Sequence, residues 1–179
     1  MRDTYSFQDY VHDYAVWTAA RAQRSFTTTK KVKDAIAQSG LQEFSKARKC
    51  SSTEEFNNFH RSCAKQVIEA FNKADIKNAT YGRVAKIIAI YLKTSVIIPM
   101  VGQGVICQVI HPPIDRILLT NLCREHHIKK LCERGWTSLT EEDYWSLYER
   151  IKQENLKFDW TLERYWHPEQ EKERSDEKE

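Results

Sequence analysis

Lys86 and Asp115 are the two residues whose types and surroundings could support covalent chemistry together. Lys86 lies in YGRVAKIIAIYLK (81–93), the most apolar helical pattern of the chain, and Asp115 follows the two prolines of HPPIDRILL (111–119). Burial in an apolar cleft disfavours the charged form of a lysine, and the neutral amine can attack an electrophilic carbon to form a Schiff base. A carboxylate beside the amine can help to move protons. The pair therefore indicates nucleophilic chemistry by a lysine with an aspartate partner.

A structural interpretation of the same two residues stays open. Long charged side chains on amphipathic helices usually extend to solvent, which would place the Lys86 ammonium in water. Asp115 would then cap its own helix or pair with Arg116. The spacing alone does not choose between the chemical and the structural interpretation.

The segments that carry the pair are both predicted to be helices. Residues 81–93 place their apolar side chains on one stripe, formed by Val84, Ile87, Ile88, Tyr91 and Leu92. Pro112 and Pro113 suit the start of the second helix, which puts Asp115 in its first turn, where the helix dipole favours a carboxylate. The predicted buried side of this helix consists of Ile114, Ile117, Leu118 and Leu122.

An uncharged segment, residues 94–110, joins the two helices. It contains Pro99, Gly102 and Gly104, and it is short and interrupted for a membrane span. We predict a buried connection that folds the Lys86 helix and the Asp115 helix together, and no membrane association.

The sequence AKIIAIYLK followed by HPPIDRILL resembles the core of the helix-hairpin-helix DNA glycosylases, most closely their archaeal 8-oxoguanine branch. In that branch a lysine helix of similar pattern precedes a Pro-x-Asp helix start at similar spacing, so the resemblance implies Lys86 as the catalytic lysine and Asp115 as the catalytic aspartate. It covers the stretch from Tyr81 to Leu122 and the flanks only loosely. The chain is also similar to small uncharacterised bacterial proteins with YG…K, PID and an aromatic C-terminal segment. The family's hairpin glycines lie just before the lysine, where this chain has only Gly82.

The resemblance implies an all-α, compact single-domain bundle, for which the periodicity predicts about seven or eight helices. It implies a protein that binds DNA, flips a base into a cleft, excises it and cleaves the strand at the abasic site, with no metal or organic cofactor. Trp17 or Tyr14 would stack on the flipped base. The other candidate substrate-binding residues surround the pair and are Tyr81, Gly82, Arg83, Lys93 and Arg116.

Two other functions stay open. The chain could be a non-catalytic nucleic-acid-binding or protein-interaction module, including a subunit of a bacterial defence system, with Lys86 serving a phosphate or a structural salt bridge. It could also be a helical partner in a larger assembly that exposes its aromatic C-terminal segment as an interface. A fold by itself does not decide among these functions.

The N-terminal third is predicted to form three helices. The first, 6–24, begins at Ser6 and is expected to pack its aromatic face, Phe7, Tyr10, Val11, Tyr14 and Trp17, on the core. The second begins in the threonines 27–29 and ends at Gly40, and the basic residues at 46–49 fall in the following connection. Ser52 with Glu55 forms a capping-box pattern that opens a third helix to Lys73.

The C-terminal third is rich in large aromatic anchors. Thr140 with Asp143 is predicted to cap a further helix. The following segment, FDWTLERYW (158–166), has one apolar side, which is formed by Phe158, Leu162, Tyr165 and Trp166. We expect most of these rings to lie in the core and to hold the C-terminus against the first helix.

Composition indicates one domain, 1–168, followed by a charged tail, 169–179. The net charge is +3, and the tail, with six acids and three bases, leaves the body at +6. A moderately basic body permits binding to nucleic acid without requiring it. Walker A, dinucleotide-binding, HExxH and GxSxG patterns do not occur.

The five cysteines are odd in number and form no CxxC pair, so we predict neither a disulfide framework nor a zinc site. Free thiols and the polar N-terminus fit a cytoplasmic protein. His126 and His127 are adjacent, cannot share a helix face, and therefore predict no metal site.

Overall fold

The computed structural model describes residues 5–23, 26–126 and 135–168, and within these ranges the regular structure is entirely helical. The all-α prediction is therefore confirmed for this part of the chain. The α-helices are α1 (Phe7–Arg21), α2 (Thr29–Ala37), α3 (Leu41–Ala47), α4 (Thr53–Lys73), α5 (Tyr81–Leu92), α6 (Val105–Val109), α7 (Arg116–His126) and α8 (Glu141–Gln153). A π-helical turn, η2 (Lys93–Ile97), continues α5, and two 3₁₀ helices, η4 (Trp136–Ser138) and η5 (Trp160–Tyr165), flank α8. None of the described helices is long and apolar enough to cross a membrane.

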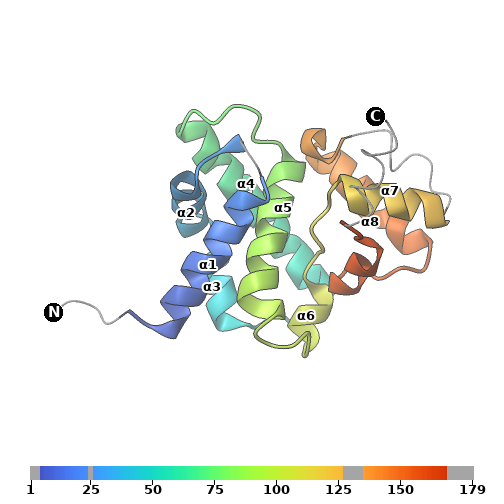
Figure 1. Cartoon of the computed structure of the whole chain (residues 1–179), viewed down its shortest axis with the longest axis horizontal. Helices are drawn as coiled ribbons and strands as arrows, with labels where there is room; N and C mark the ends of the chain where they lie inside the picture. Colours follow the sequence, from blue (N-terminus) through green and yellow to red (C-terminus); the bar gives the residue numbers. More distant parts are fainter. Residues whose placement is uncertain (1–4, 24–25, 127–134, 169–179) are drawn as a thin grey trace.

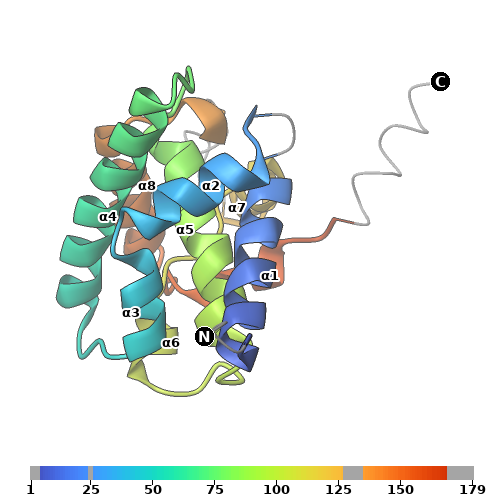
Figure 2. The ribbon, with the colours of Figure 1, turned by 90° about the vertical axis from the view of Figure 1, so that its left-hand side faces the viewer.

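Helix α5 lies at the centre of the molecule. Figure 1 shows it between the N-terminal helices α1–α4 on one side and α7, α8 and the C-terminal segment on the other. It packs directly against α1, α4, α8 and η4. Viewed from the side in Figure 2, α1 and α4 lie on either side of it. A helix that is apolar nearly all round has to be enclosed in this way.

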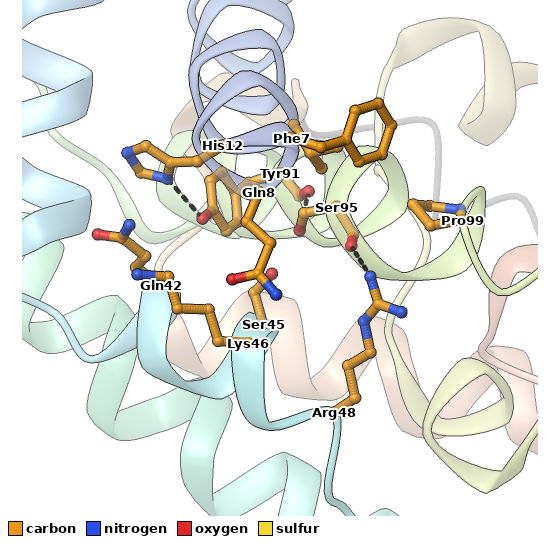
Figure 3. A pocket seen from close by; sticks show the side chains of 11 residues that line it. Phe7, Gln8, His12, Gln42, Ser45, Lys46, Arg48, Tyr91, Ser95 and Pro99 are labelled. Carbon is orange, nitrogen blue, oxygen red and sulfur yellow. Dashed lines mark hydrogen bonds between the residues drawn. The ribbon is translucent and has the colours of Figure 1, made fainter. Parts of the chain in front are cut away.

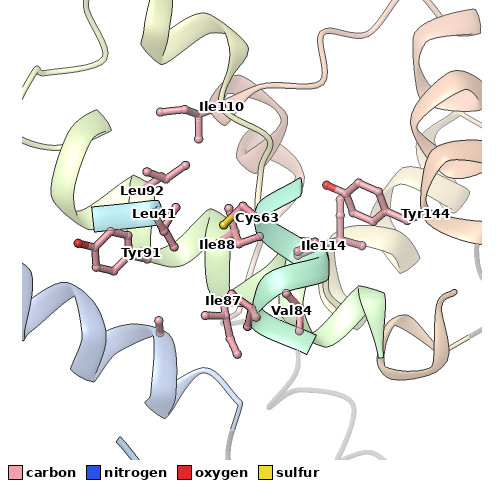
Figure 4. Close-up of a cluster of buried hydrophobic side chains, with 14 of the residues drawn as sticks. Leu41, Cys63, Val84, Ile87, Ile88, Tyr91, Leu92, Ile110, Ile114 and Tyr144 are labelled. Carbon is pink, nitrogen blue, oxygen red and sulfur yellow. The ribbon is translucent and has the colours of Figure 1, made fainter. Parts of the chain in front are cut away.

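The core around α5 draws side chains from both halves of the chain. Val84, Ile87, Ile88 and Leu92 are fully buried, and they meet Leu41 from α3, Cys63 from α4, Ile110 and Ile114 from the following segment, and Tyr144 from α8 (Figure 4). The buried apolar residues form one continuous cluster. Residues 169–179, the predicted charged tail, lie outside the described residues.

The predicted helix starts are confirmed by their capping hydrogen bonds. Ser6 and Thr140 each form a capping box, with Asp9 and Asp143 respectively. Ser52 accepts from the backbone N–H of Glu55 and so caps α4. These contacts involve residues three apart, which is why the sequence alone reveals them.

Two predictions about packing were wrong. The face of α1 that reaches the core consists of Ala15, Val16, Ala19 and Ala20, while the aromatic side chains of Phe7, Tyr10, Tyr14 and Trp17 are exposed. Small side chains let α1 approach α5 closely, whereas the large rings do not fit between the two backbones. The connection 94–110 is only partly buried, because Ile98, Val101 and Val105 lie at the surface.

Two helix boundaries also differ from prediction. The basic residues at 46–49 do not all lie in a connection, because α3 extends through Ala47. Helix α7 begins at Arg116, so Asp115 precedes the helix and does not lie in its first turn. The prolines keep His111 and Pro112 extended, and Asp115 caps the helix from outside, since its Oδ1 accepts from the backbone N–H of Leu118.

The cysteines depart from prediction at one position. Cys50, Cys63 and Cys107 are free thiols, as expected, whereas Cys123 is disulfide-bonded. Cys132 lies outside the described residues.

A polar cluster, the histidine cluster, is enclosed where α4, α5 and α8 meet. His60 Nδ1 lies 3.0 Å from the Tyr81 hydroxyl, and His111 Nδ1 lies 3.0 Å from the Tyr144 hydroxyl. His111 Nε2 is 2.9 Å from Oδ1 of Asn57. Burial lowers the pKa of His60 to about 3 and also lowers the pKa of His111. Both imidazoles are therefore neutral and belong to the core.

Candidate functional site

A cavity of about 610 Å³ opens beside the N-terminal half of α5. Its walls come from the segment after α1, the link before α5, the start of α7 and η4; the lining residues are Ala22, Gln23, Phe26, Lys77, Asn78, Arg83, Lys86, Asp115, Arg116, Ile117, Trp136 and Thr137. Volumes of about 300–1,000 Å³ are typical of small-molecule sites. Lys86 and Asp115, the two residues singled out by the sequence, both line this space, and we call it the Lys86–Asp115 cavity.

The two side chains contact each other. Lys86 Nζ lies 3.3 Å from Oδ2 of Asp115, although the residues are 29 positions apart. Lys86 is only 8% exposed, so the interpretation in which its ammonium extends into bulk water is wrong. The Asp115 side chain at the same time caps α7, because its Oδ1 accepts from the backbone N–H of Leu118 at 3.0 Å.

Two tryptophans complete the surroundings of the pair. The Lys86 Nζ lies 4.4 Å from the ring centroid of Trp136, within the range of a cation–π contact. The indole Nε1–H of Trp166 donates to Oδ2 of Asp115 at 3.1 Å. The carboxylate is therefore held in one orientation by α7, Lys86 and Trp166 together.

The start of α5 positions Trp136 over the pair. Thr80 caps α5 and donates from its hydroxyl to the carbonyl of Thr137 at 2.7 Å. The N–H of Gly82 donates to the carbonyl of Leu139 at 3.0 Å. A Cβ atom on Gly82 would lie 2.0 Å from the carbonyl oxygen of Trp136, so only glycine permits this contact. The backbone of Gly82 therefore packs directly against η4 and does not face open solvent.

The cavity is strongly cationic. Its lining includes Lys77, Arg83, Lys86 and Arg116 but only one carboxylate, that of Asp115. The guanidinium of Arg83 lies 4.5 Å from the ring centroid of Phe26, and partial burial lowers its pKa below the ordinary value. An excess of positive charge in a concave site attracts anionic ligands such as phosphate groups.

Two buried polar atoms beside the cavity have no hydrogen-bond partner within the described part of the protein. They are Oε1 of Gln23, an acceptor, and Nε of Arg83, a donor. The amide of Gln23 is otherwise fixed, since its Nε2 donates to the carbonyl of Arg83 at 3.1 Å. Buried polar groups are almost always satisfied, so this donor and acceptor indicate a place for a polar ligand.

The structure brings together only some of the predicted site residues. Lys86, Asp115, Arg83 and Arg116 line one cavity. Tyr81 does not, because its buried hydroxyl accepts from Trp145 Nε1 and faces His60. Lys93 is the first residue of η2, beyond the end of α5, and it pairs with Glu163.

Trp17 and Tyr14 lie outside the cavity as well. They belong to an exposed aromatic stripe on α1, which we define as Phe7, Tyr10, Tyr14 and Trp17. Successive rings stack with centroid separations of 5.9, 6.3 and 5.6 Å, and the guanidinium of Arg21 lies 5.9 Å from the ring centroid of Trp17.

Sequence reasoning missed several residues of the site. Trp136, Trp166, Gln23 and Lys77 were not selected. The abundance of tryptophan in the C-terminal third was the available signal, but it carried no information about which ring reaches Lys86.

The cavity offers a lysine amine, a carboxylate, cations and an aromatic face, a set suited to nucleophilic or acid–base chemistry on an anionic substrate. Among the described residues, no three His, Cys, Asp or Glu side chains are grouped closely enough to hold a metal ion. His126 Nε2 lies 2.9 Å from the Tyr165 hydroxyl, and His127 lies outside the described residues.

The chain was compared with protein-family models, with curated proteins and with solved structures, and none of them matches it. The function is therefore argued from the geometry of the site.

Proposed function

We propose that the protein is a DNA base-excision enzyme of the glycosylase/AP-lyase type, in which Lys86 is the nucleophile and Asp115 its partner. The observation that carries the proposal is the contact of 3.3 Å between Lys86 Nζ and Asp115 Oδ2 in a cationic cavity. A reactive amine needs a neighbouring group that moves protons, and an anionic substrate needs positive charge around it. This cavity supplies both.

The reaction begins with a base flipped out of the duplex into the cavity. The neutral amine of Lys86 attacks the sugar C1′ while the bond from C1′ to the base breaks; the base leaves with the bonding electron pair and takes a proton from water. The carboxylate of Asp115 stabilises the positive charge that develops on the sugar and accepts a proton from Nζ. The sugar ring then opens as its ring oxygen takes that proton from Asp115, which gives the protonated imine between Nζ and C1′.

The imine then permits strand cleavage. Loss of a proton from C2′ leads to elimination of the 3′ phosphate, and hydrolysis of the imine by water restores the Lys86 amine. Lys77, Arg83 and Arg116 are placed to hold the phosphates that flank the flipped nucleotide. The face of Trp136, which already contacts Lys86 Nζ, is the ring that would stack on the base.

The link between α4 and α5 contains two residues with positive φ values. The hairpin of the helix-hairpin-helix glycosylases lies just before the lysine helix, and the chain lacks its usual glycines there. Asp75 and Asn78 nevertheless adopt positive φ values of 56° and 64°, a conformation that glycine normally supplies.

A non-catalytic nucleic-acid-binding module is the second candidate. One observation favours it: both carboxylate oxygens of Asp115 are engaged, one by the cap of α7 and the other by Lys86 and Trp166. Such a carboxylate can serve structure alone, with Lys86 as a buried counter-charge.

Imine trapping separates the two candidates. The protein is incubated with duplexes that carry 8-oxoguanine, uracil or an abasic site, and borohydride reduces any imine to a stable covalent adduct. We expect an adduct that disappears in Lys86→Ala and weakens in Asp115→Asn. The matched control is Lys30→Ala, which removes an exposed lysine that pairs with Asp34 and is expected to trap like the wild type.

Two results would count against the proposal in different ways. An adduct that persists in Lys86→Ala would assign the chemistry to another amine. Tight binding to DNA with no adduct on any of the three substrates would establish the binding module instead.

A further inference from the structure

A second cavity lies at the other end of α5, between the N-terminal half of α1, helix α3 and η2 (Figure 3). We call it the α1–α3 cavity; it is lined by Phe7, Gln8, Val11, His12, Gln42, Ser45, Lys46, Arg48, Tyr91, Ser95 and Pro99. Its volume of about 220 Å³ lies below the range of about 300–1,000 Å³ that drug-sized ligands occupy. The space therefore suits a small ligand.

Hydrogen-bonding groups form the inner part of this cavity. The Nδ1 atom of His12 lies 2.9 Å from the hydroxyl of Tyr91, whose ring is fully buried. Ser45 is buried beside them, and Gln8 and Gln42 contribute amide groups from α1 and α3. A small polar molecule would meet several donors here.

Two exposed cations, Lys46 and Arg48, stand at the mouth of the cavity, and the described residues that line it include no carboxylate. Within the described residues neither cation forms a salt bridge. The nearby carboxylates are engaged elsewhere, since Asp9 caps α1 and Asp13 pairs with Lys33. The guanidinium of Arg48 reaches only a long contact of 3.5 Å to the carbonyl of Ser95. Lys46 and Arg48 thus keep their charges without a salt bridge among the described residues. Hydrogen bonds from Ser6 lower the pKa of the Asp9 carboxyl, and Lys46 lies close enough to lower it further.

The backbone has an unusual conformation at two residues that line the cavity, Arg48 and Ser95. Arg48 has a φ of 49°, in the left-handed region that disfavours side chains with a Cβ atom. Ser95 belongs to the π-helical turn η2, a rare form that often occurs at functional sites. Arg48 and Ser95 both line the α1–α3 cavity, where the guanidinium of one meets the carbonyl of the other.

We propose that the α1–α3 cavity binds the phosphate group of a small ligand, inorganic phosphate or a phosphate monoester. Lys46 and Arg48 would hold the charge at the mouth, and His12, Ser45 and the amides would donate to the phosphate oxygens. Phe7, Val11 and Pro99 supply an apolar wall for the rest of a monoester. This site does not depend on the chemistry proposed for Lys86.

The test follows the imidazole of His12 by NMR in the full-length, ¹⁵N-labelled protein. Its signals are identified by their loss in His12→Gln, and sodium phosphate is titrated at constant ionic strength maintained with chloride. We expect a saturable shift of the His12 signals. Because charge-assisted hydrogen bonds are removed, the double variant Lys46→Gln/Arg48→Gln should bind phosphate about tenfold more weakly or worse.

Arg48→Gly guards against an effect of misfolding. Glycine tolerates the positive φ at this position, so this variant is expected to fold while it loses the guanidinium. It should again weaken binding, whereas Lys30→Gln, a change of the same charge on α2, should not. A His12 shift that grows without saturation, or equal affinity in the double variant, would overturn the proposal.

Further titrations assign the source of the phosphate. A response to inorganic phosphate and to dAMP, but not to an oligonucleotide without a terminal phosphate, would support a free small ligand. An equal response to that oligonucleotide would support a contact with the phosphates of a bound nucleic-acid strand.

Discussion

The Lys86–Asp115 pair and the His60–His111 pair both bury titratable side chains beside α5, but they differ in access and in partners. Lys86 has a carboxylate at 3.3 Å and faces a cationic cavity. His60 and His111 are enclosed by aromatic rings, and their hydrogen-bond partners, Tyr81, Tyr144 and Asn57, are neutral. The first pair lies next to open space, and the second consists of neutral rings in a closed core.

The difference separates a site from a structural element. Buried groups are tolerated as ions when a counter-charge satisfies them, and as neutral groups when uncharged partners do. Of the two pairs, Lys86 and Asp115 line a cavity that a substrate can enter, whereas the two histidines do not. A search for histidines with a strongly shifted pKa would have selected the histidine cluster. Burial lowers the pKa of both rings, but a buried ring is not accessible to a substrate.

The largest expected effect is the dependence of stability on pH in the histidine cluster. Histidines titrate near pH 6.5 when unfolded, whereas His60 does so at about 3 in the folded protein, and His111 is also lowered. Between these values the unfolded chain binds more protons, so the free energy of unfolding should fall by roughly 1.4 kcal/mol per pH unit for each histidine as pH drops below 6.5.

Urea unfolding between pH 7 and 5 measures this slope, in a window above the range in which carboxylates titrate. Each of the variants His60→Gln and His111→Gln should reduce the slope by about 1.4 kcal/mol per pH unit, which corresponds to one proton. A stability that stays constant from pH 7 to 5 would contradict the sealed, neutral character of the cluster.

The second prediction concerns Asp115, the carboxylate of the open pair. Asp115→Ala removes both the counter-charge of Lys86 and the cap of α7, and should lower the free energy of unfolding by about 3 kcal/mol. Asp115→Asn keeps an acceptor for the cap, so it should cost about half as much. Asp34→Ala, which breaks an exposed pair with Lys30, is the control and should cost less than about 0.5 kcal/mol. Equal losses for Asn and Ala would show that the cap contributes nothing, and an unchanged stability of Asp115→Asn would show that the charge contributes nothing.

Local signals in the sequence were enough to predict much of the fold. Ser6, Ser52 and Thr140 mark helix starts through contacts only three residues long. The apolar pattern of 81–93 also identified the central helix. Lys86 and Asp115 were found because each stands out within its own segment.

The rest of the site depends on contacts that no local pattern encodes. Trp136 reaches Lys86 from 50 positions away, and Trp166 reaches Asp115 across 51 positions. The error at α1 had another cause, since hydrophobicity pointed to the aromatic face while close packing on α5 required Ala15 and Ala19. Size, and not apolarity, decided which face was buried.

The third prediction concerns Gly82, which connects the two regions. It lies between Tyr81, a member of the histidine cluster, and Arg83, a wall of the cavity, and it touches the backbone of Trp136. Gly82→Ala should lower the free energy of unfolding by about 1–3 kcal/mol, because a methyl group cannot fit 2.0 Å from a carbonyl oxygen. Gly135→Ala, whose new Cβ would meet its nearest atom at 3.8 Å, serves as the control. A fully stable Gly82→Ala would mean that η4 is not anchored through this glycine.

The smallest expected effect is at Trp17, on the exposed stripe outside both buried pairs. Trp17→Ala should change stability by less than about 0.5 kcal/mol, since the ring is 46% exposed. If DNA that enters the cavity crosses the end of α1, loss of one stacking ring should weaken binding of a long oligonucleotide by roughly 1 kcal/mol, or about fivefold. Fluorescence anisotropy measures this affinity, and trapping at saturating DNA should remain, because Trp17 does not line the cavity. Unchanged affinity would remove the stripe from the DNA-binding surface and confine recognition to the cationic cavity.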